Sequence, residues 1–523
     1  MSYFDHLTAI NPFLSLCLLP LIFFAVFRPQ KQAHHHHNPA PQSYPIVGNL
    51  PGLFRNRHRF HDWVADMLSE TPSSTLQVNS FLNLPHGVCT ANPVNVHHLL
   101  VANFHNYVKG SRFRDHLHEL LGHGIFGVDG DLWTVQRKIS SHEFNTKSLK
   151  HFISDVVTSQ LTHNLVPRFA NASDENRVVD LQEVLQRFTF SNICKVAFGI
   201  DISSLDIANS GFAFAKAFDD AVEICSSRFL NPIPAIWKIQ RLLNIGSEKK
   251  LREAIDTVNA FALKIIESKE KEEQIEENRD LLSRFMSKTS SEMEFEDEET
   301  RRKFLRDIVI SFVLAGKDST STALTWFFWL INGHPHCERL ILDEITELDS
   351  NFTYDDLKKL NYLHAALSES LRLFPPVPIN SRLTVDDDVW PDGTHVSKGW
   401  FADYSAYAMG RMATVWGPDC REFKPERWLD GGDNDGGDGG GVFKPSDQFK
   451  FPAFHCGPRT CLGKEMAFVQ MKTIVVTLMR EFEIVAVDGG ATAEKMVDPP
   501  YTLSLLLKMR GGLHVRLNKR TVT

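Results

Sequence analysis

Apolar residues recur at helical spacing through the middle of the chain, between Phe60 and Glu369. The pattern is clearest over Leu181 to Phe198, Leu251 to Glu267 and Phe304 to Leu330. A repeat of three and four residues places these side chains on one face, so we expect helices that bury that face in a common core. The middle of the protein is therefore predicted to be helical.

Short runs of β-branched and aromatic residues, bounded by turn residues, predict a few strands toward the two ends of the chain. They lie at Thr75 to Val78, Gly87 to Thr90, Thr394 to Val396 and Thr502 to Val515, and the last run contains the turn signal Gly511-Gly512. We therefore expect a mainly α-helical fold with minor β sheets.

The N-terminal segment is continuously apolar. Leu7 to Phe27 contains 21 residues without a charged side chain, close to the roughly 20 that a membrane-spanning helix needs. Arg28 and Lys31 follow it, and the positive-inside rule then leaves the C-terminal part in the cytosol. We expect one N-terminal transmembrane helix within residues 1–28. A cleavable signal peptide is the alternative, although the segment lacks a basic start.

Residues 29–45 are rich in Pro and His and predict a hinge, because they cannot pack a core of their own. No linker or repeat interrupts residues 46–523, which predicts one globular domain. Within it, residues 431–441 are almost entirely Gly and Asp, have few side chains to bury, and predict a disordered surface loop.

Composition narrows the classes of function. The chain has 523 residues, including 38 Phe, and is 43% hydrophobic, which is typical of a globular protein and excludes a disordered one. The 56 Lys and Arg are outnumbered by 64 Asp and Glu, so the net charge of −8 offers no general attraction to nucleic acid. The eight cysteines form no CxxC pair, which disfavours structural zinc, iron–sulfur clusters and a disulfide scaffold and fits a reducing compartment.

One segment near the C-terminus carries the strongest chemical signal. It reads Phe-His-Cys-Gly-Pro-Arg-Thr-Cys-Leu-Gly over residues 454–463, and a helix-like stretch from Lys464 to Arg480 follows. We expect Cys461 at the start of this helix, where free backbone N–H groups and the helix dipole stabilise a thiolate. Such a thiolate can ligate a metal, whereas a lone cysteine is more often a small buried hydrophobe.

This segment resembles the haem-binding signature Phe-x-x-Gly-x-Arg-x-Cys-x-Gly of the cytochrome P-450 superfamily, with matches at Phe454, Gly457, Arg459, Cys461 and Gly463. The resemblance implies the cytochrome P-450 fold, a haem cofactor and Cys461 as the proximal ligand of its iron. It also implies that Arg459 pairs with a haem propionate and that Phe454 packs near the sulfur.

Other residues of the family pattern are present in the expected order. Trp133 and Arg137 match its Trp-x-x-x-Arg, and Arg382 looks like a further partner, so the resemblance implies that all three reach the propionates. Cys456 stands where relatives usually carry a small residue and is the weaker candidate for the iron ligand.

Glu369 and Arg372 lie three residues apart, on one face of a predicted helix. With Arg427 they resemble the family's buried Glu-Arg-Arg network, which implies a structural role in supporting the loop that carries the cysteine. Without the resemblance, a weak surface ion pair explains the spacing equally well.

Residues 315–320, Ala-Gly-Lys-Asp-Ser-Thr, interrupt a long apolar helix and resemble the family's oxygen-activation motif. Gly, Asp and Ser are poor helix formers, so their clustering predicts a local widening of the helix. The resemblance implies that Asp318, Ser319 and Thr320 help to deliver protons. Ser319 replaces the usual Thr, which keeps the hydroxyl but frees its rotamer.

Segments such as Tyr407 to Arg411 and Trp416 to Cys420 resemble the plant fatty-acid ω-hydroxylase and jasmonoyl-amino-acid hydroxylase branch. This resemblance implies a small lipid substrate, dioxygen, and electrons from NADPH through an NADPH–cytochrome P-450 reductase. It also implies an endoplasmic reticulum membrane protein with a cytosolic catalytic domain over residues 46–523, and no nucleic-acid partner.

Candidate substrate residues follow from the same resemblance. Val377, Ile379, Leu503 and Phe214 match positions at which relatives line an apolar channel, which suits a lipid. Arg112 is a candidate for holding a carboxylate at the channel mouth. Ordinary core packing and solvated surface charge are the alternatives.

Other functions stay open. A jasmonoyl conjugate or a sterol side chain is an alternative substrate, and a hydroperoxide isomerase or dehydratase is an alternative enzyme on the same fold. The acid at 318 and the hydroxyl at 319 argue against the isomerase. A non-catalytic haem binder, or an apolar-ligand-binding membrane protein without haem, explains fewer of the motifs.

Overall fold

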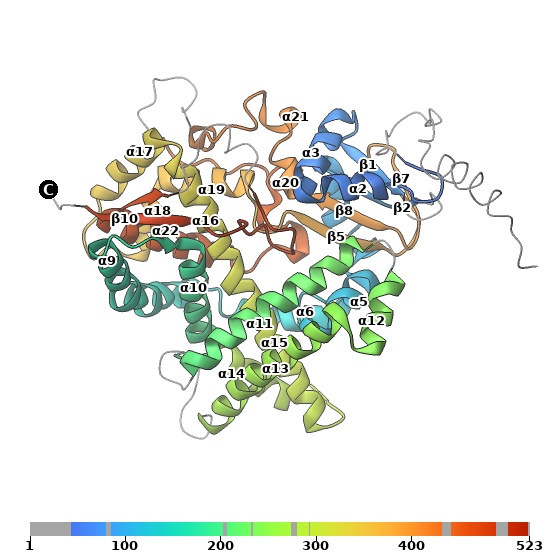
Figure 1. Ribbon diagram of the computed structural model, residues 1–523, viewed down its shortest axis with the longest axis horizontal. Coiled ribbons are helices and arrows are strands. Elements are labelled where there is room, and N and C mark those ends of the chain that lie inside the picture. The colour runs from blue at the N-terminus through green and yellow to red at the C-terminus, as the bar shows by residue number, and fades with distance from the viewer. Residues whose placement is uncertain are drawn as a thin grey trace, which may run out of the picture.

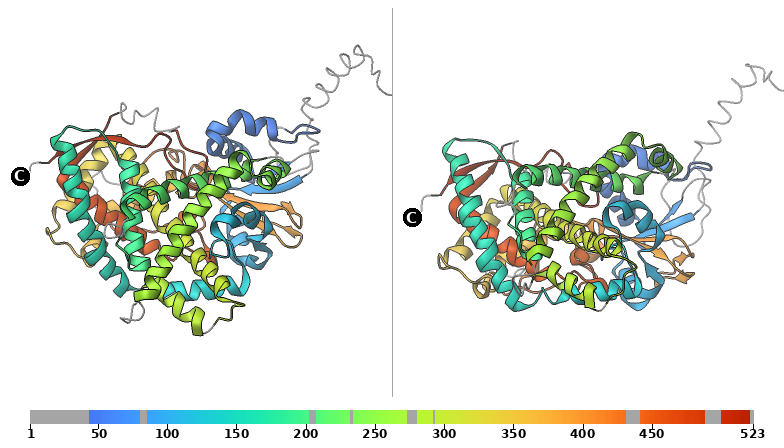
Figure 2. Two further views of the ribbon diagram at one scale, coloured as in Figure 1. Left: turned by 60° about the horizontal axis from the view of Figure 1, so that its bottom comes forward. Right: turned by 90° about the horizontal axis from the view of Figure 1, so that it is seen from below.

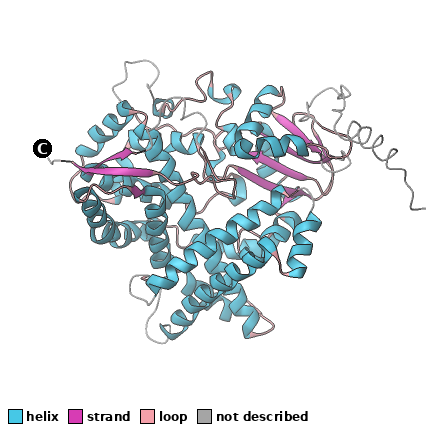
Figure 3. Ribbon diagram, viewed as in Figure 1, coloured by secondary structure: helices cyan, strands magenta, loops and turns pink. Residues whose placement is uncertain are grey.

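The computed structural model describes residues 43–79, 85–201, 207–231, 234–272, 280–291, 293–430, 441–487 and 500–520. Helices dominate, and Figure 3 shows the strands in two groups at opposite sides of the molecule. The prediction of a mainly helical fold with minor sheets is confirmed. The predicted N-terminal helix, nearly all of the hinge and the Gly/Asp loop up to residue 440 lie outside the described residues. None of the helices in these ranges has the length and apolar content that crossing a bilayer requires.

The larger sheet combines strands from distant parts of the chain in the order β1-β2-β8-β5-β3. These strands are β1 (Thr75–Asn79), β2 (Pro85–Thr90), β8 (Phe401–Ser405), β5 (Ile379–Thr384) and β3 (Tyr107–Val108). Strands β2 and β8 are parallel, and the other neighbours are antiparallel. Strands from the two parts of the chain where strands were predicted therefore join in one sheet, because β2 bonds directly to β8.

A three-stranded antiparallel sheet has the order β4-β10-β9, and a two-stranded ribbon pairs β6 with β7. Their bounds are β4 (Val179–Asp180), β10 (His514–Lys519), β9 (Phe482–Ala486), β6 (Asp388–Val389) and β7 (His395–Val396).

The strand predicted over Thr502 to Val515 is wrong for most of its length, since β10 begins only at His514. The backbone before β10 forms hydrogen bonds with residues outside the sheet. Leu507 N donates to Pro376 O at 2.9 Å, and the Leu507 carbonyl accepts from Trp326 Nε1 at 2.6 Å. These tertiary bonds take the place of a ladder.

Hydrophobic periodicity located the long helices well. α10 spans Leu181–Phe198, and the second predicted helix lies within α13 (Gly246–Glu272). Asp180 caps α10 by accepting from two backbone N–H groups, and Gly199 at φ 69° ends it in the left-handed region. The further helices are α2 (Leu50–Asn56), α3 (Phe60–Glu70), α4 (Pro93–His97), α5 (Gly110–Leu121), α6 (Gly130–Ser141), α7 (Thr146–His151), α8 (Thr158–Gln160), α9 (Val166–Asp174), α11 (Ile207–Ser227), α12 (Pro234–Leu243), α14 (Leu281–Ser291), α17 (Pro335–Thr346), α18 (Tyr354–Lys359), α19 (Asn361–Leu373), α20 (Ala406–Met409), α21 (Ala413–Trp416) and α22 (Lys464–Glu481).

The third predicted helix forms the central element of the fold (Figure 1). α15 (Glu298–Val313) and α16 (Ser319–Asn332) are joined without a break by the π-helical segment η8 (Leu314–Asp318). The predicted local widening is confirmed, because a π-helix inserts one residue into a turn. Buried apolar clusters lie against both halves, and α11 and α13 cross one face of the molecule together (Figure 2).

Candidate active site

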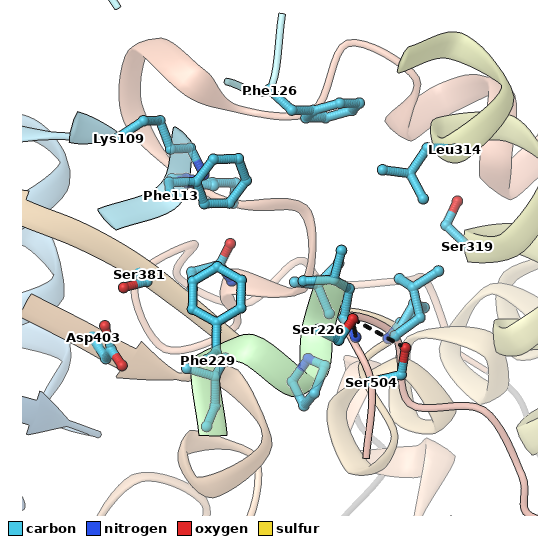
Figure 4. Close-up of a pocket in the computed structure, with 18 of the residues that line it drawn as sticks. Lys109, Phe113, Phe126, Ser226, Phe229, Leu314, Ser319, Ser381, Asp403 and Ser504 are labelled. Atoms are coloured by element: carbon cyan, nitrogen blue, oxygen red, sulfur yellow. Dashed lines mark hydrogen bonds between the residues drawn. The ribbon is translucent and has the colours of Figure 1, made fainter. Parts of the chain in front are cut away.

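A cavity of about 1050 Å³ lies where the five-stranded sheet, the central helix and the segment around Cys461 meet. Apolar side chains form much of its wall, among them Phe113, Phe126, Phe229 and Leu314 (Figure 4). Ligand pockets usually run to about 1000 Å³, so this interior is large enough for a sizeable apolar ligand.

The loop that precedes α22 holds Cys461 at the cavity wall. Cys461 N donates to Phe454 O at 2.8 Å, and Thr460 N donates to Gly457 O at 3.0 Å. Gly457 adopts φ +66°, and a Cβ there would lie 2.3 Å from Leu100 O, so only glycine fits the turn. The Cys461 side chain lies inside the protein and is accessible from the cavity that it lines.

The side chains of the two cysteines in this loop have different surroundings. Cys456 is fully buried, and its Sγ donates to Gln448 O at 3.0 Å. Burial raises the pKa of the Cys456 thiol to about 12. Cys456 does not line the cavity, so only Cys461 of the pair is available to a ligand there.

The expected position of Cys461 at the first turn of the helix needs a correction, because α22 begins three residues later at Lys464. Burial raises the pKa of the Cys461 thiol above its ordinary value, and the Gly463 N–H, Arg137 and Lys464 oppose that shift. The thiolate is therefore supported by one backbone N–H and two cations rather than by a full helix terminus.

Cationic side chains gather beside Cys461. Arg137 donates to Thr460 O at 2.7 Å, and Arg459 donates to Asp129 Oδ1 at 2.8 Å while its guanidinium lies 4.6 Å from the centre of the Trp133 ring. Lys109, Trp133, Arg137 and Arg459 all line the cavity. Burial and neighbouring cations lower the pKa of Arg459 to about 10 and that of Lys109 well below its usual range.

Arg382 does not reach the cavity surface, which corrects its expected placement. It is buried, bonds His455 and the Ser381 carbonyl, and leaves its Nε without a partner. Its partner His455 does line the cavity.

The three residues of the oxygen-activation motif separate in space. Ser319 and Thr320 line the cavity, and Ser319 Oγ donates to Ala315 O at 2.6 Å. Asp318 is fully buried behind them, does not line the cavity, and accepts from Lys317 Nζ at 2.8 Å and pairs with Lys508 Nζ at 3.0 Å.

Sequence reasoning missed the charge cluster around Asp318. Lys317 and Lys508 both also bond Asp219 Oδ1, at 2.7 and 3.0 Å, which joins α11, η8 and the segment before β10. The two lysines lower the pKa of Asp318 against the effect of its burial. Lys317 could have indicated this cluster, because a lysine inside an apolar helix is rare unless it is paired with an acidic residue.

Four of the five predicted substrate residues line the cavity, and one does not. Val377, Ile379, Leu503 and Arg112 line the cavity. Phe214 does not, which corrects its placement: it is fully buried and stacks on Phe190 at 5.1 Å and Phe261 at 4.1 Å between ring centres. The Phe214 side chain is therefore part of the aromatic packing between α10, α11 and α13.

Glu369, Arg372 and Arg427 meet in a buried cluster. Arg372 forms two bonds of 2.7 Å to the Glu369 carboxylate, and Arg427 Nε adds a third at 2.8 Å. Trp428 Nε1 donates to the same carboxylate at 2.9 Å, and Arg372 also bonds the Cys420 carbonyl at 2.6 Å. Glu369 and Arg372 have fully buried side chains, so a surface ion pair is excluded.

Comparison with known proteins identifies the family. The cytochrome P450 family model matches residues 39–512. The chain belongs to the cytochrome P450 family. It is 44% identical to cytochrome P450 94A1 of Vicia sativa, over 92% of this chain and 90% of that one. It is 42% identical to cytochrome P450 94B3 of Arabidopsis thaliana over 96% of both chains, and 42% identical to cytochrome P450 CYP94D108 of Paris polyphylla over 92% and 94%.

As a cytochrome P450, this protein is a haem-thiolate monooxygenase that receives electrons from a redox partner. The cavity fits that cofactor in two respects. Cys461 presents a sulfur to the interior, and Lys109, Arg137 and Arg459 form a cationic wall that neighbouring carboxylates neutralise only in part. Haem is dianionic through its two propionates, so its charge complements this wall.

We expect Glu369→Gln to destabilise the cytochrome P450 fold by about 3–5 kcal/mol, because it leaves two buried guanidiniums without their carboxylate. Glu183→Gln is the matched control, since Glu183 forms an exposed pair with Arg187 of a kind worth about 1 kcal/mol or less. Urea denaturation followed by circular dichroism measures both. Equal loss of stability in the two variants would contradict the structural role of the network.

Proposed function

We propose that this cytochrome P450 hydroxylates the terminal carbon of a fatty-acid chain. The observation that carries the proposal is that one cavity has Cys461 and Ser319, the apolar residues Val377, Ile379 and Leu503, and Arg112 in its wall. The reaction consumes dioxygen and NADPH with one proton, and yields the hydroxy acid, water and NADP⁺. The electrons come from NADPH through NADPH–cytochrome P450 reductase.

The cofactor assignments follow from contacts around the cavity. Cys461 would supply the thiolate ligand of the haem iron, Trp133, Arg137 and Arg459 would hold the propionates, and Arg382, which bonds His455, would add positive charge nearby. Phe454 packs on Phe468 at 5.3 Å between ring centres. Gly457 permits the loop's turn, and Gly463 leaves the sulfur uncovered, since a Cβ there would lie 3.9 Å from Sγ. When bound, haem supplies the redox chemistry that activates dioxygen for insertion into a C–H bond.

Protons reach the reaction through the widened helix. Ser319 lies in the cavity wall, and its hydroxyl donates to Ala315 O, so this bond would have to open for the hydroxyl to pass its proton to the cavity. Thr320 lies beside it, and Asp318 is the buried acid behind them. Because Asp318 is paired with two lysines, its carboxylate stays ionised and does not itself enter the cavity.

Terminal hydroxylation requires that the end of the substrate chain be held in position. A terminal methyl C–H bond is stronger than its neighbours, so a freely moving chain is oxidised at internal carbons. Val377, Ile379 and Leu503 restrict the chain end, and the hydroxyls of Ser226 and Ser504, 3.5 Å apart, join α11 to the segment that carries Leu503. Holding one reactive geometry is a recognised source of rate and selectivity.

The proposal includes the location of the protein. An N-terminal helix within residues 1–28 anchors it in the endoplasmic reticulum membrane, residues 29–45 form the hinge, and residues 46–523 form the cytosolic catalytic domain. The apolar N-terminal sequence followed by basic residues supports this arrangement. Hydroxylation of a jasmonoyl conjugate or a sterol side chain is the second candidate, since the apolar residues of the cavity wall would suit either substrate as well.

We expect Cys461→Ser to abolish the red-shifted Soret band of the ferrous carbon monoxide complex, because that band requires a thiolate ligand. Cys456→Ser is the matched control and should retain the band, since its Sγ is bonded to Gln448 O outside the cavity. Loss of the band in the control together with its retention in Cys461→Ser would reverse the ligand assignment.

Ser319→Ala should retain the haem and reductase-driven NADPH oxidation but release more hydrogen peroxide per molecule of product, because a proton donor at the cavity wall is lost. Ser319→Thr should couple as well as the wild type or better. Peroxide, NADPH and product measured in one reaction test this. An unchanged ratio in Ser319→Ala would remove the hydroxyl from the mechanism.

With medium- and long-chain fatty acids, the wild type should give mainly the ω-hydroxy acid, and Val377→Ala or Leu503→Ala should shift oxidation to internal carbons. Phe214→Leu is the control, because Phe214 lies outside the cavity wall. Product positions are measured by mass spectrometry. No turnover of fatty acids, with turnover of a jasmonoyl conjugate or a sterol, would replace the proposed substrate.

A further inference from the structure

The cavity has a polar end away from the central helix. Figure 4 places Ser381 and Asp403 at one side of the cavity and Ser319 and Leu314 at the other. The apolar residue Phe229 lies toward the polar end. A ligand that extends from Ser319 to Asp403 therefore meets two different environments, and the polar end is the place for a head group.

Asp403 is held rigidly by the five-stranded sheet. It lies on β8 directly opposite Ser381 of β5 in antiparallel register, so the two side chains share one face. Oδ1 of Asp403 and Oγ of Ser381 are buried, and neither forms a hydrogen bond of regular geometry in the described structure, although the Ser381 hydroxyl is near enough to lower the pKa of Asp403. An unsatisfied buried polar group is costly, and a ligand that donates a hydrogen bond here removes that cost.

Arg112 supplies the opposite charge at this end. Its guanidinium lies 4.4 Å from the centre of the ring of Phe401, which precedes Asp403 by two residues on β8, and its Nε is buried without a partner in the described structure. Arg112 and Asp403 together carry no net charge. The polar end thus offers one donor group and one acceptor group, rather than a purely cationic site.

The charged and titratable groups around Asp403 come from three elements. They are Arg112 of α5, Arg382 of β5, and Cys89 and His86 of β2. Burial raises the pKa of Asp403 to about 6, and Arg112, Ser381 and Arg382 oppose that rise only in part. Asp403 is therefore mainly ionised at pH 7, but it accepts a proton readily.

We propose that Asp403 and Ser381 select lipids whose head group donates a hydrogen bond, with Arg112 holding an acceptor oxygen of the same head group. The inference rests on the proposed function and names the chemistry of the substrate's polar end. A fatty alcohol meets the requirement with its O–H. A fatty acid meets it only when one proton is shared between its carboxylate and Asp403, because two adjacent ionised carboxylates repel each other.

This mechanism predicts a linkage between fatty-acid binding and proton uptake. Above the pKa of free Asp403, each bound carboxylate must bring one proton, so the Kd of a fatty acid should rise about tenfold per pH unit. The Kd of an alcohol of equal chain length should stay constant over the same range. A methyl ester, which has no donor, should bind about tenfold more weakly than the alcohol.

The experiment titrates the full-length haem enzyme with dodecanoate, dodecanol and methyl dodecanoate from pH 6 to 8, and measures Kd from the substrate-induced shift of the Soret band. Asp403→Asn removes the ionisable partner, so it should abolish the pH dependence for dodecanoate. Asp386→Asn is the matched control, because Asp386 is exposed and pairs with Lys398 at 3.0 Å. It should bind all three lipids as the wild type does.

The outcomes separate the two proposals. A steep pH dependence for dodecanoate alone, lost in Asp403→Asn, supports the head-group site. A constant Kd for dodecanoate in the wild type, or equal binding of alcohol and ester, overturns it while leaving lipid hydroxylation intact. The wild-type series decides the matter even if Asp403→Asn fails to fold. If none of the three lipids shifts the Soret band, both proposals fall.

Discussion

The structure depends on one buried charge cluster. The carboxylate of Glu369 in α19 receives bonds from Arg372, Arg427 and the Trp428 indole. Since both oxygens are occupied and the side chains are buried, the chain from Gly410 to Trp428 has little freedom to move. Trp428 then packs against Phe451 at 4.8 Å between ring centres, just before the loop that holds Cys461. The ion pair is thus connected, through Trp428 and Phe451, to the segment that leads into the Cys461 loop.

The cavity wall has a cationic part and an apolar part. Near Cys461 its wall is cationic, which favours an anionic cofactor; beyond that it is apolar, which favours a hydrocarbon chain. The widened segment η8 brings Ser319 into this wall while keeping the charge of Asp318 behind it, paired with Lys317 and Lys508. A hydroxyl faces the ligand, and the full charges remain covered. That division keeps the charge of Asp318 away from the apolar part of the cavity.

Much of the fold could be predicted because hydrophobic periodicity is a local property. α10 matched its predicted bounds, and the poor helix formers at residues 316–319 located the π-helical widening. Cys461, Ser319 and Leu503 could be named from motifs, since each motif needs particular residue types at close spacing. The sequence did not specify what long-range contacts decide: the β2–β8 pairing, the irregular backbone before β10, and the stacking of Phe214 away from the cavity.

The sequence by itself determined the class of protein, its helical middle and the cysteine that can serve a haem, because these follow from nearest neighbours along the chain. Only the tertiary structure decided which charges meet. Lys508 reaches Asp318 across 190 residues, and Asp403 faces Ser381 only because β5 and β8 pair in one register. The energy of a charge depends on burial and on partners a few ångströms away, and no local pattern in the chain specifies those partners.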